Sequence, residues 1–258
     1  VEKSGFDFVG PSASVIRRMG NKVSAKEFRF LHISSCFPRK GISELIDAYF
    51  ATFQGNDNVS LIIKTFENPH NNIETIINEK SKANIEDLPH ILVIDHDLSE
   101  AEMKSLYLQS NVLVAPSYGE GFGLPIAEAM SLGIPVITTS WGGQTDFCTD
   151  LNSWLLDYTF VNSNSHFQVP TSYWAQPSIK HLKNLLNQLY NCSYTQIEQK
   201  VLQAKKDISS YTWEENAKLN LKFVQSLNSC SQTKKSIIGF LTTYDKRCGI
   251  ASYSEDLI

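Results

Sequence analysis

Residues 112–140 have the sequence VLVAPSYGEGFGLPIAEAMSLGIPVITTS, and this stretch decides the fold of the chain. It begins with a short apolar run, which is typical of a buried strand, and passes through a glycine-rich turn into a segment that favours a helix. Pro125 suits the first turn of that helix, and Gly133 suits its end, directly before a second apolar run. Strand, turn, helix and strand in this order indicate an α/β fold.

The turn between strand and helix has the properties of an anion site. The unpaired N–H groups of a first helical turn and the positive end of the helix dipole attract a phosphate. Gly121 and Gly123 let the backbone approach a ligand without a Cβ in the way. Glu120 and Glu128, with seven residues between them, are unfavourable next to a phosphate, but their paired oxygens suit vicinal hydroxyls. Phosphate and diol together suggest a sugar nucleotide.

This pattern resembles the donor-binding motif of the retaining family-four glycosyltransferases, which share the two-domain GT-B architecture. In that family the first Glu contacts the transferred sugar, the second binds the ribose, and backbone N–H groups of the turn meet sugar and phosphate. The resemblance implies a catalytic role for Glu120, a ribose contact for Glu128, and donor binding by Gly121, Phe122, Gly123 and Leu124. The alternative is that Glu120 is a solvated loop residue and Glu128 an exposed helix position.

A second match lies in FRFLHISSCFPRKGISELIDAYF, residues 28–50. A strand pattern is followed by apolar residues at helical spacing, so residues 34–41 form a loop at the carboxyl end of a strand, where open α/β sheets bind ligands. The same glycosyltransferases neutralise the diphosphate with an Arg and a Lys in this loop, usually as Gly-Arg-Leu followed by Lys-Gly. Lys40 and Gly41 keep the second part, whereas Ser34-Ser35-Cys36 stands where Gly-Arg-Leu is expected.

The cations of this loop have two interpretations. Arg39 either supplies the charge that is missing at Ser35, or the site has one cation. Lys40 is expected to neutralise the diphosphate, with about two negative charges, because an ammonium group is a compact point charge. Ser34 and Ser35 are expected to contact the donor. The alternative for Lys40 is a solvated lysine in front of a helix.

The composition fits an intracellular globular enzyme domain. With 258 residues, 42% of them hydrophobic, the chain can bury one large core or two modest ones. It shows no apolar run near 18 residues and no leader pattern, so we expect neither a membrane span nor a signal peptide. A net charge of −4 without a basic cluster argues against nucleic acid as a partner. Five scattered cysteines indicate a reducing cytoplasm rather than a disulfide framework or a zinc site.

Strand and helix signals alternate along the chain, as a parallel sheet covered on both faces requires. Besides the stretches above, we expect strands at residues 59–64, 91–94 and 154–156. Helices are expected at residues 73–82 and, from a capping box at Ser99, to about residue 110. We expect further helix caps at Thr195 and Thr212, and a long loop at residues 157–177. Right-handed connections place every ligand loop at one edge of the sheet.

Two further loops end strands at that edge. Residues 141–146, WGGQTD, either line the pocket with their glycine pair or form a simple turn with Trp141 packed as core. Residues 95–97, Asp-His-Asp, could pass for a metal or acid–base cluster, but a loop histidine with satisfied hydrogen bonds is the better interpretation. The other histidines show no metal-ligand spacing, and we expect no metal site.

The predicted fold class is α/β, a Rossmann-like parallel sheet with helices on both faces, as in the C-terminal domain of a GT-B enzyme. We expect residues 1–27 to be a linker or the end of a preceding domain. Residues 28–228 form the nucleotide-sugar-binding domain, and residues 229–258 resemble the start of a following, acceptor-side module. No cofactor is expected besides a nucleoside diphosphate sugar, UDP- or GDP-linked, as substrate.

The resemblance implies retaining transfer of a sugar from this donor to a glycan acceptor, in cell-surface polysaccharide or glycoconjugate biosynthesis. The acceptor would be held by an N-terminal domain, so this stretch alone should be inactive. A cytoplasmic location is expected, with peripheral membrane contact through other parts of the protein. A GT-B epimerase or phosphorylase, or a non-catalytic sugar-nucleotide-binding module, remains as an alternative function.

Overall fold

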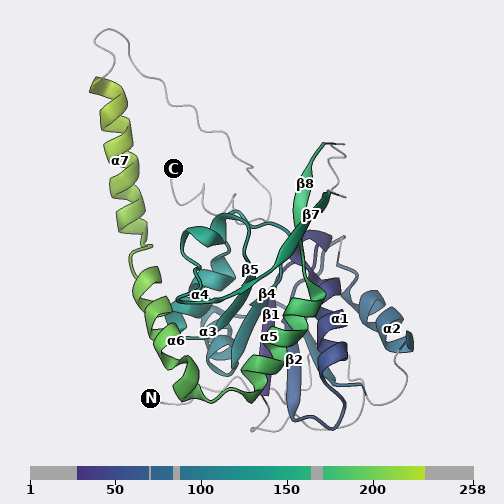
Figure 1. Cartoon of the computed structure of the whole chain (residues 1–258). Helices are drawn as coiled ribbons and strands as arrows, with labels where there is room; N and C mark the ends of the chain where they lie inside the picture. The colour runs from purple at the N-terminus through teal and green to yellow at the C-terminus, as the bar shows by residue number, and fades with distance from the viewer. Residues whose placement is uncertain (1–27, 70, 84–87, 164–170, 230–258) are drawn as a thin grey trace. The chain divides into compact units, whose positions relative to one another are not determined.

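The computed structural model describes residues 28–69, 71–83, 88–163 and 171–229. Its centre is a six-stranded sheet in which every neighbouring pair of strands is parallel (Figure 1). The strands are β1 (Phe28–Ile33), β2 (Val59–Lys64), β3 (His90–Ile94), β4 (Val112–Ala115), β5 (Val136–Thr139) and β6 (Trp154–Leu156). Their order across the sheet is β3-β2-β1-β4-β5-β6, which confirms the predicted parallel α/β architecture.

Helices cover both faces of this sheet. Successive side chains of a strand point to opposite faces, so Phe30 lies in one core cluster and Leu31 in the other. The first cluster is completed by α1 (Ile42–Thr52), α2 (Ile73–Ala83) and α5 (Ile179–Asn191). The second is completed by α3 (Glu100–Leu108), α4 (Leu124–Leu132) and α6 (Tyr194–Ile208). Both faces are therefore buried, as the apolar strands require.

Local capping explains where several helices begin and end. Ser99 accepts a hydrogen bond from the Glu102 N–H, and the Glu102 carboxylate accepts one from the Ser99 N–H, so the predicted capping box is present. Gly133 ends α4 with φ at +78°, a conformation that favours glycine. The prediction of a cap at Thr195 is wrong, because the cap of α6 lies two residues earlier, at Ser193, with Gln196 as its partner.

The strand order reverses between β1 and β4. From β1 the chain moves outward through β2 to β3, and from β4 it moves in the opposite direction through β5 to β6. The chain therefore continues in opposite directions after β1 and after β4, and the carboxyl edge at this point is where an open α/β sheet usually has its ligand crevice. The two sequence stretches with the strongest functional signal end at this one point.

The expected long loop at residues 157–177 is a hairpin instead. Strands β7 (Tyr158–Asn162) and β8 (Tyr173–Pro177) pair antiparallel, and residues 164–170 between them lie outside the described part. The Ala175 N–H donates to the Tyr118 carbonyl at 3.0 Å, and the Trp174 ring lies 4.8 Å from the Tyr118 ring. The hairpin is thus attached to the loop after β4. Aromatic residues alternate along its first strand, a strand signal that the abundant Asn and Ser residues obscured.

The chain from Tyr211 onward forms a second unit, of which the structure describes α7 (Trp213–Ser229). Its start has the predicted cap, since the Thr212 hydroxyl accepts a hydrogen bond from the Glu215 N–H at 3.2 Å. The predictions for residues 1–27, and those for residues 230–258, lie outside the described residues. Within the described part, no helix combines the length and apolar character that crossing a membrane requires.

Candidate functional site

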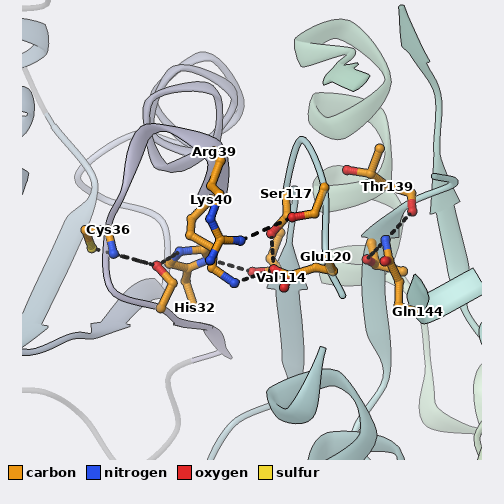
Figure 2. Close-up of polar contacts among 12 residues, drawn as sticks. His32, Cys36, Arg39, Lys40, Val114, Ser117, Glu120, Thr139 and Gln144 are labelled. Atoms are coloured by element: carbon orange, nitrogen blue, oxygen red, sulfur yellow. Dashed lines mark hydrogen bonds and ion pairs between the residues drawn. The ribbon is translucent and has the colours of Figure 1, made fainter. Parts of the chain in front are cut away.

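The loops after β1 and β4 are joined to each other at the crevice (Figure 2). The Tyr118 N–H donates to the Arg39 carbonyl at 2.8 Å, and Arg39 Nη1 donates to the Gly119 carbonyl at 3.3 Å. Gly41 has φ at +69°, and a Cβ there would lie 1.9 Å from the Pro116 carbonyl oxygen. The close approach of the two loops therefore requires glycine at position 41.

An ion pair crosses the crevice next to this contact. Lys40 Nζ lies 2.6 Å from Glu120 Oε1, and the Ser117 hydroxyl donates to the same carboxylate oxygen at 2.6 Å. The two side chains are only 17% and 10% exposed. Neither residue is therefore the freely solvated surface residue of the alternative interpretation. The structure brings together the two residues for which the strongest roles were predicted, from loops that are 80 residues apart in sequence.

Arg39 lies beside this pair but is exposed, and its guanidinium group contacts the loop of Glu120 rather than the carboxylate itself. Exposure leaves this group able to reach a ligand that enters the crevice, and its planar shape suits two phosphate oxygens at once. Arg39 therefore lies at the same edge of the sheet as Ser35, where the family usually has an arginine. The assignment of that charge to Arg39 stays a prediction.

A buried histidine organises the loop after β1. His32 Nδ1 lies 2.8 Å from the Val114 carbonyl oxygen, which can only accept, so Nδ1 carries the proton. His32 Nε2 must then accept a hydrogen bond from the Ser34 hydroxyl, 2.8 Å away. The Ser34 oxygen also accepts from the Cys36 N–H at 3.0 Å, at a residue whose φ is +54°. Sequence reasoning missed His32 because its role depends on a carbonyl of a distant strand.

The hydrogen bonds of this loop determine which groups of Ser34 and Ser35 could contact a donor. The single hydroxyl proton of Ser34 is engaged by His32, so this hydroxyl could meet a phosphate only after the network rearranges. The Ser35 carbonyl accepts a hydrogen bond from the Asn68 side chain at 3.0 Å, which links the loop after β1 to the loop after β2. Both serines lie at the predicted edge of the sheet, and their contact with a donor stays a prediction.

Burial lowers the pKa of His32 to about 4, and the positive charge of Lys40 contributes to the lowering, against the hydrogen bond to Val114. The unfolded chain therefore binds a proton between pH 6.5 and 4 that the folded chain does not, so stability falls as pH falls through this window. Between pH 7 and pH 5 the loss due to His32 should be about 2 kcal/mol. Urea unfolding of the wild type and of His32→Gln at both pH values measures it. Equal pH dependence of the two proteins would contradict the assignment.

Glu128 lies on α4 and is held by α3. The Tyr107 hydroxyl donates to Glu128 Oε2 at 2.6 Å, and burial together with the Glu128 charge raises the pKa of Tyr107. Tyr107 itself is buried, whereas Glu128 is exposed. One carboxylate oxygen is thus fixed in place while the residue remains accessible to a ligand. Tyr107 was not predicted from the sequence, because its contact joins two helices.

The glycine-rich turn leads directly into α4, as the sequence predicts. Gly123 is the N-cap of α4 with φ at +85°, and its carbonyl accepts a hydrogen bond from the Ile126 N–H at 2.9 Å. A Cβ at Gly121 would meet no other atom of the described protein within 4 Å, so this face of the turn is open. Phe122 and Leu124 flank the turn with exposed side chains. Their backbone groups could meet a ligand here, as the resemblance implies.

The loop after β5 supports the turn from the other side. The Gly143 N–H donates to the Glu120 carbonyl at 2.9 Å, and a Cβ at Gly143 would lie 1.7 Å from the Gly121 carbonyl oxygen. Trp141 is 45% exposed, so it is not packed as core. The glycine pair therefore lies against the backbone that positions Glu120. This arrangement favours the interpretation that residues 141–146 line the candidate site over that of a simple turn.

The side chain of Gln144 holds the loop after β5 through hydrogen bonds to its backbone. Its side chain is buried and donates from Nε2 to the Thr139 and Trp141 carbonyls, both at 2.9 Å (Figure 2). Its Oε1 atom has no hydrogen-bond partner among the described residues. A Cβ at Gly142 would lie 2.6 Å from this oxygen, so the tight fold of the loop depends on both residues. The described ranges contain no group of three or more potential metal ligands.

Fold and site together define a Rossmann-like α/β domain with a candidate ligand site at its topological switch point. The chain belongs to the family described as glycosyl transferases group 1, whose model matches residues 17–164, more than half of the chain. This family membership agrees with the resemblance drawn from the motif at residues 112–140.

Individual relatives agree with the family. The chain is 25% identical over 142 residues to lipopolysaccharide glucosyltransferase WaaG of Escherichia coli, covering 55% of this chain and 36% of WaaG. It is 33% identical over 107 residues to the capsular polysaccharide biosynthesis glycosyltransferase CapM of Staphylococcus aureus, covering 42% and 26% of the two chains. The chain thus spans about a quarter to a third of these curated relatives.

Solved structures with the same fold include HepE from Anabaena, determined in complex with UDP and glucose. The TM-score is 0.56 and the identity 19%, and the match covers 79% of this chain and 48% of HepE. At this identity the likeness shows the fold alone.

Proposed function

We propose that this chain is the donor-binding domain of a retaining glycosyltransferase, which transfers a sugar from a nucleoside diphosphate sugar to a hydroxyl of a glycan acceptor. The observation that carries the proposal is the partly buried pair of Lys40 and Glu120 at the switch point, within the residues that the family model matches. The names of WaaG and CapM support polysaccharide or glycoconjugate biosynthesis as the setting. The complex of HepE with UDP and glucose supports a nucleotide-sugar donor.

The ion pair suggests how the donor enters. In the structure Lys40 and Glu120 neutralise each other, which keeps both charges favourable in a partly buried site. A bound diphosphate would take over Lys40, and the freed Glu120 carboxylate could then accept hydrogen bonds from hydroxyls of the sugar. In this exchange Lys40 keeps an anionic partner, and the Glu120 carboxylate keeps the hydrogen bond from Ser117 and gains those of the sugar hydroxyls. The exchange also separates the two residues into a diphosphate role and a sugar role.

The leaving group is stabilised by groups that are fixed before reaction. Bond cleavage at the sugar leaves negative charge on the diphosphate, and in this proposal Lys40 and the N-terminus of α4 after Gly123 supply the positive potential that stabilises it. Arg39 supplies a further positive charge at the edge. The acceptor belongs to another domain, so the donor domain alone should bind the donor and fail to transfer the sugar.

The direct test is donor binding by the purified chain. A ligand that binds only the folded state at 100 times its dissociation constant stabilises the fold by about 2.7 kcal/mol. Thermal unfolding in the presence of millimolar UDP, GDP and ADP, and of their sugar derivatives, measures this effect. If none of these ligands shifts Tm, the proposal is wrong.

Substitution of the two glutamates should separate their roles. Glu128→Gln should weaken the binding of nucleoside diphosphate and of nucleotide sugar alike, since one charge-assisted hydrogen bond is worth about 1.5–3 kcal/mol. Glu120→Gln should weaken the binding of the nucleotide sugar only. It should leave the binding of the bare diphosphate intact or improve it, because the internal competitor for Lys40 is removed. Isothermal titration calorimetry with UDP and a UDP-sugar measures both effects.

Tyr107→Phe is the matched control for this experiment. It keeps the Glu128 carboxylate and removes only the hydrogen bond that fixes it, so its effect should resemble that of Glu128→Gln but be smaller. Equal losses of affinity for the bare diphosphate in Glu120→Gln and Glu128→Gln would exclude separate roles.

A further inference from the structure

Lys64 is a buried lysine at the ligand edge of the sheet. It is the last residue of β2, in an otherwise apolar or small sequence, VSLIIK, and it is only 8% exposed. Its Nζ donates to the Thr65 carbonyl at 2.6 Å, and in the described ranges this is the only hydrogen bond of the ammonium group. An ammonium group has three donors, and the described part of the chain supplies a hydrogen-bond acceptor for one of them.

A lysine at this position is costly for the fold. Burial of the ammonium group lowers the pKa of Lys64, and the carboxylates of Asp97 and Asp95 oppose the shift from the loop after β3. An apolar residue of similar volume would complete β2 without this desolvation. Neither packing nor internal hydrogen bonding therefore explains the lysine, whereas a ligand with a hydrogen-bond acceptor would.

The position of Lys64 relative to the candidate site follows from the sheet. Counting outward from β4, which carries the Glu120 loop, the order is β1, β2 and β3. Neighbouring strands are about 4.8 Å apart, so the edge from β4 to β3 spans roughly 14 Å. Lys40 lies in the loop after β1 and pairs with Glu120 after β4, and Lys64 ends β2, the strand between β1 and β3. A nucleoside diphosphate bound through its phosphates at Lys40 would extend its base along this edge.

Lys64 lies on the face of the sheet that is covered by the helix carrying Glu128. Lys64 and Ile62 share one face of β2, and Ile62 belongs to the core cluster that is covered by α3 and α4. Glu128, the proposed ribose contact, lies on α4 and is held by Tyr107 of α3. The helix that carries Glu128 and the side chain of Lys64 therefore lie on the same side of the sheet.

We infer that Lys64 contacts the nucleotide base of the donor and selects a base with a keto oxygen, uracil or guanine, over adenine. The inference rests on the proposed function and deepens it, because it names the residue that distinguishes donors. Uracil and guanine place a carbonyl oxygen where adenine has an amino group, and an ammonium group can only donate. The N–H next to that oxygen requires an acceptor, and the nearby carboxylates of Asp95 and Asp97 have acceptor oxygens.

The experiment compares Lys64→Met with the wild type in the whole chain, by calorimetric titration with UDP, GDP and ADP. The wild type should bind UDP or GDP at least tenfold more tightly than ADP. Lys64→Met should weaken the binding of the preferred nucleotide by roughly 10- to 100-fold, the value of one hydrogen bond to a charged group, and change the affinity for ADP little. Preference among the bases should therefore nearly disappear.

Thermal stability provides a second readout. Lys64→Met removes a buried charge, so its Tm without ligand should equal or exceed that of the wild type. The matched control is Lys80→Met on α2, where the lysine is paired with Asp47 and is not part of the site. This control should change neither the affinities nor the preference among bases. Lys64→Gln, which is neutral and polar, repeats the test if the methionine variant does not fold.

The outcomes separate the inference from the proposed function. If the wild type binds none of the three nucleotides, the proposed function is wrong, and the inference with it. If the wild type binds and Lys64→Met has the same affinities, or loses affinity equally for all three nucleotides, only the base contact is refuted. If both Lys64 variants fail to fold, Lys64 is a structural residue and the inference is also wrong.

Discussion

Replacement of Lys40 by methionine should abolish most of the stabilisation that a nucleoside diphosphate gives to the fold. In the wild type this stabilisation is about 2.7 kcal/mol at a ligand concentration of 100 times the dissociation constant. Without Lys40 the diphosphate loses its partly buried cation and faces the Glu120 carboxylate. This carboxylate is fixed by Ser117 and has no other cationic partner within the described part of the chain. Loss of attraction and gain of repulsion act together, so affinity should fall by more than 100-fold.

The double variant Lys40→Met, Glu120→Gln tests this explanation. Removal of the carboxylate should restore part of the affinity for the bare diphosphate, and the difference from additivity measures the coupling between the two residues. Lys80→Met serves as control for the loss of a surface lysine. An unchanged Tm shift in Lys40→Met would remove Lys40 from the site and with it the main support for the proposed function.

Gly41→Ala should destabilise the fold by about 3 kcal/mol or more. The residue has φ at +69°, and its new Cβ would lie 1.9 Å from the Pro116 carbonyl oxygen, a backbone atom that cannot move alone. Relief of this contact requires the loops after β1 and β4 to separate, which would also lengthen the ion pair between Lys40 and Glu120. Urea unfolding measures the loss of stability.

Gly121→Ala is the matched control, because it lies in the same motif and its Cβ would meet nothing within 4 Å. Its stability should stay within about 0.5 kcal/mol of the wild type. Its affinity for the donor should nevertheless fall, since the new methyl group projects from the open face of the turn. If the two glycine variants are equally stable, the close approach at Gly41 does not hold the site together.

The elements of the site could be predicted because they depend on local sequence. The apolar runs, Pro125 and Gly133 specify strand, helix start and helix end over neighbouring residues. Rules for parallel sheets then place Lys40 and Glu120 at the same edge. Their direct ion pair could not be predicted, because it requires β1 to be the neighbour of β4, and no local pattern encodes the order of strands.

The remaining differences have the same origin. The engagement of Ser34 by His32 depends on the Val114 carbonyl in another strand, and the hold of Tyr107 on Glu128 depends on the packing of two helices. The hairpin of β7 and β8 was missed because polar loop residues outnumber its alternating aromatic ones. Thr195 offered an adequate cap, but Ser193, two residues earlier, could form a full capping box with Gln196.

The imidazole of His32 has a consequence for how this domain can change over evolutionary time. Strands β1 and β4 pair only at Phe30–Val112 and Leu31–Leu113. This short pairing, called the seam here, joins the half of the sheet that contains β1, β2 and β3 to the half that contains β4, β5 and β6. His32 extends the seam by bonding to Val114, and its other nitrogen fixes the loop through Ser34. One imidazole ring therefore holds both the loop after β1 and the contact between β1 and β4. Evolution of this loop toward another donor that replaced His32 would also remove the hydrogen bond between His32 and Val114, and other contacts would have to hold β1 and β4 together.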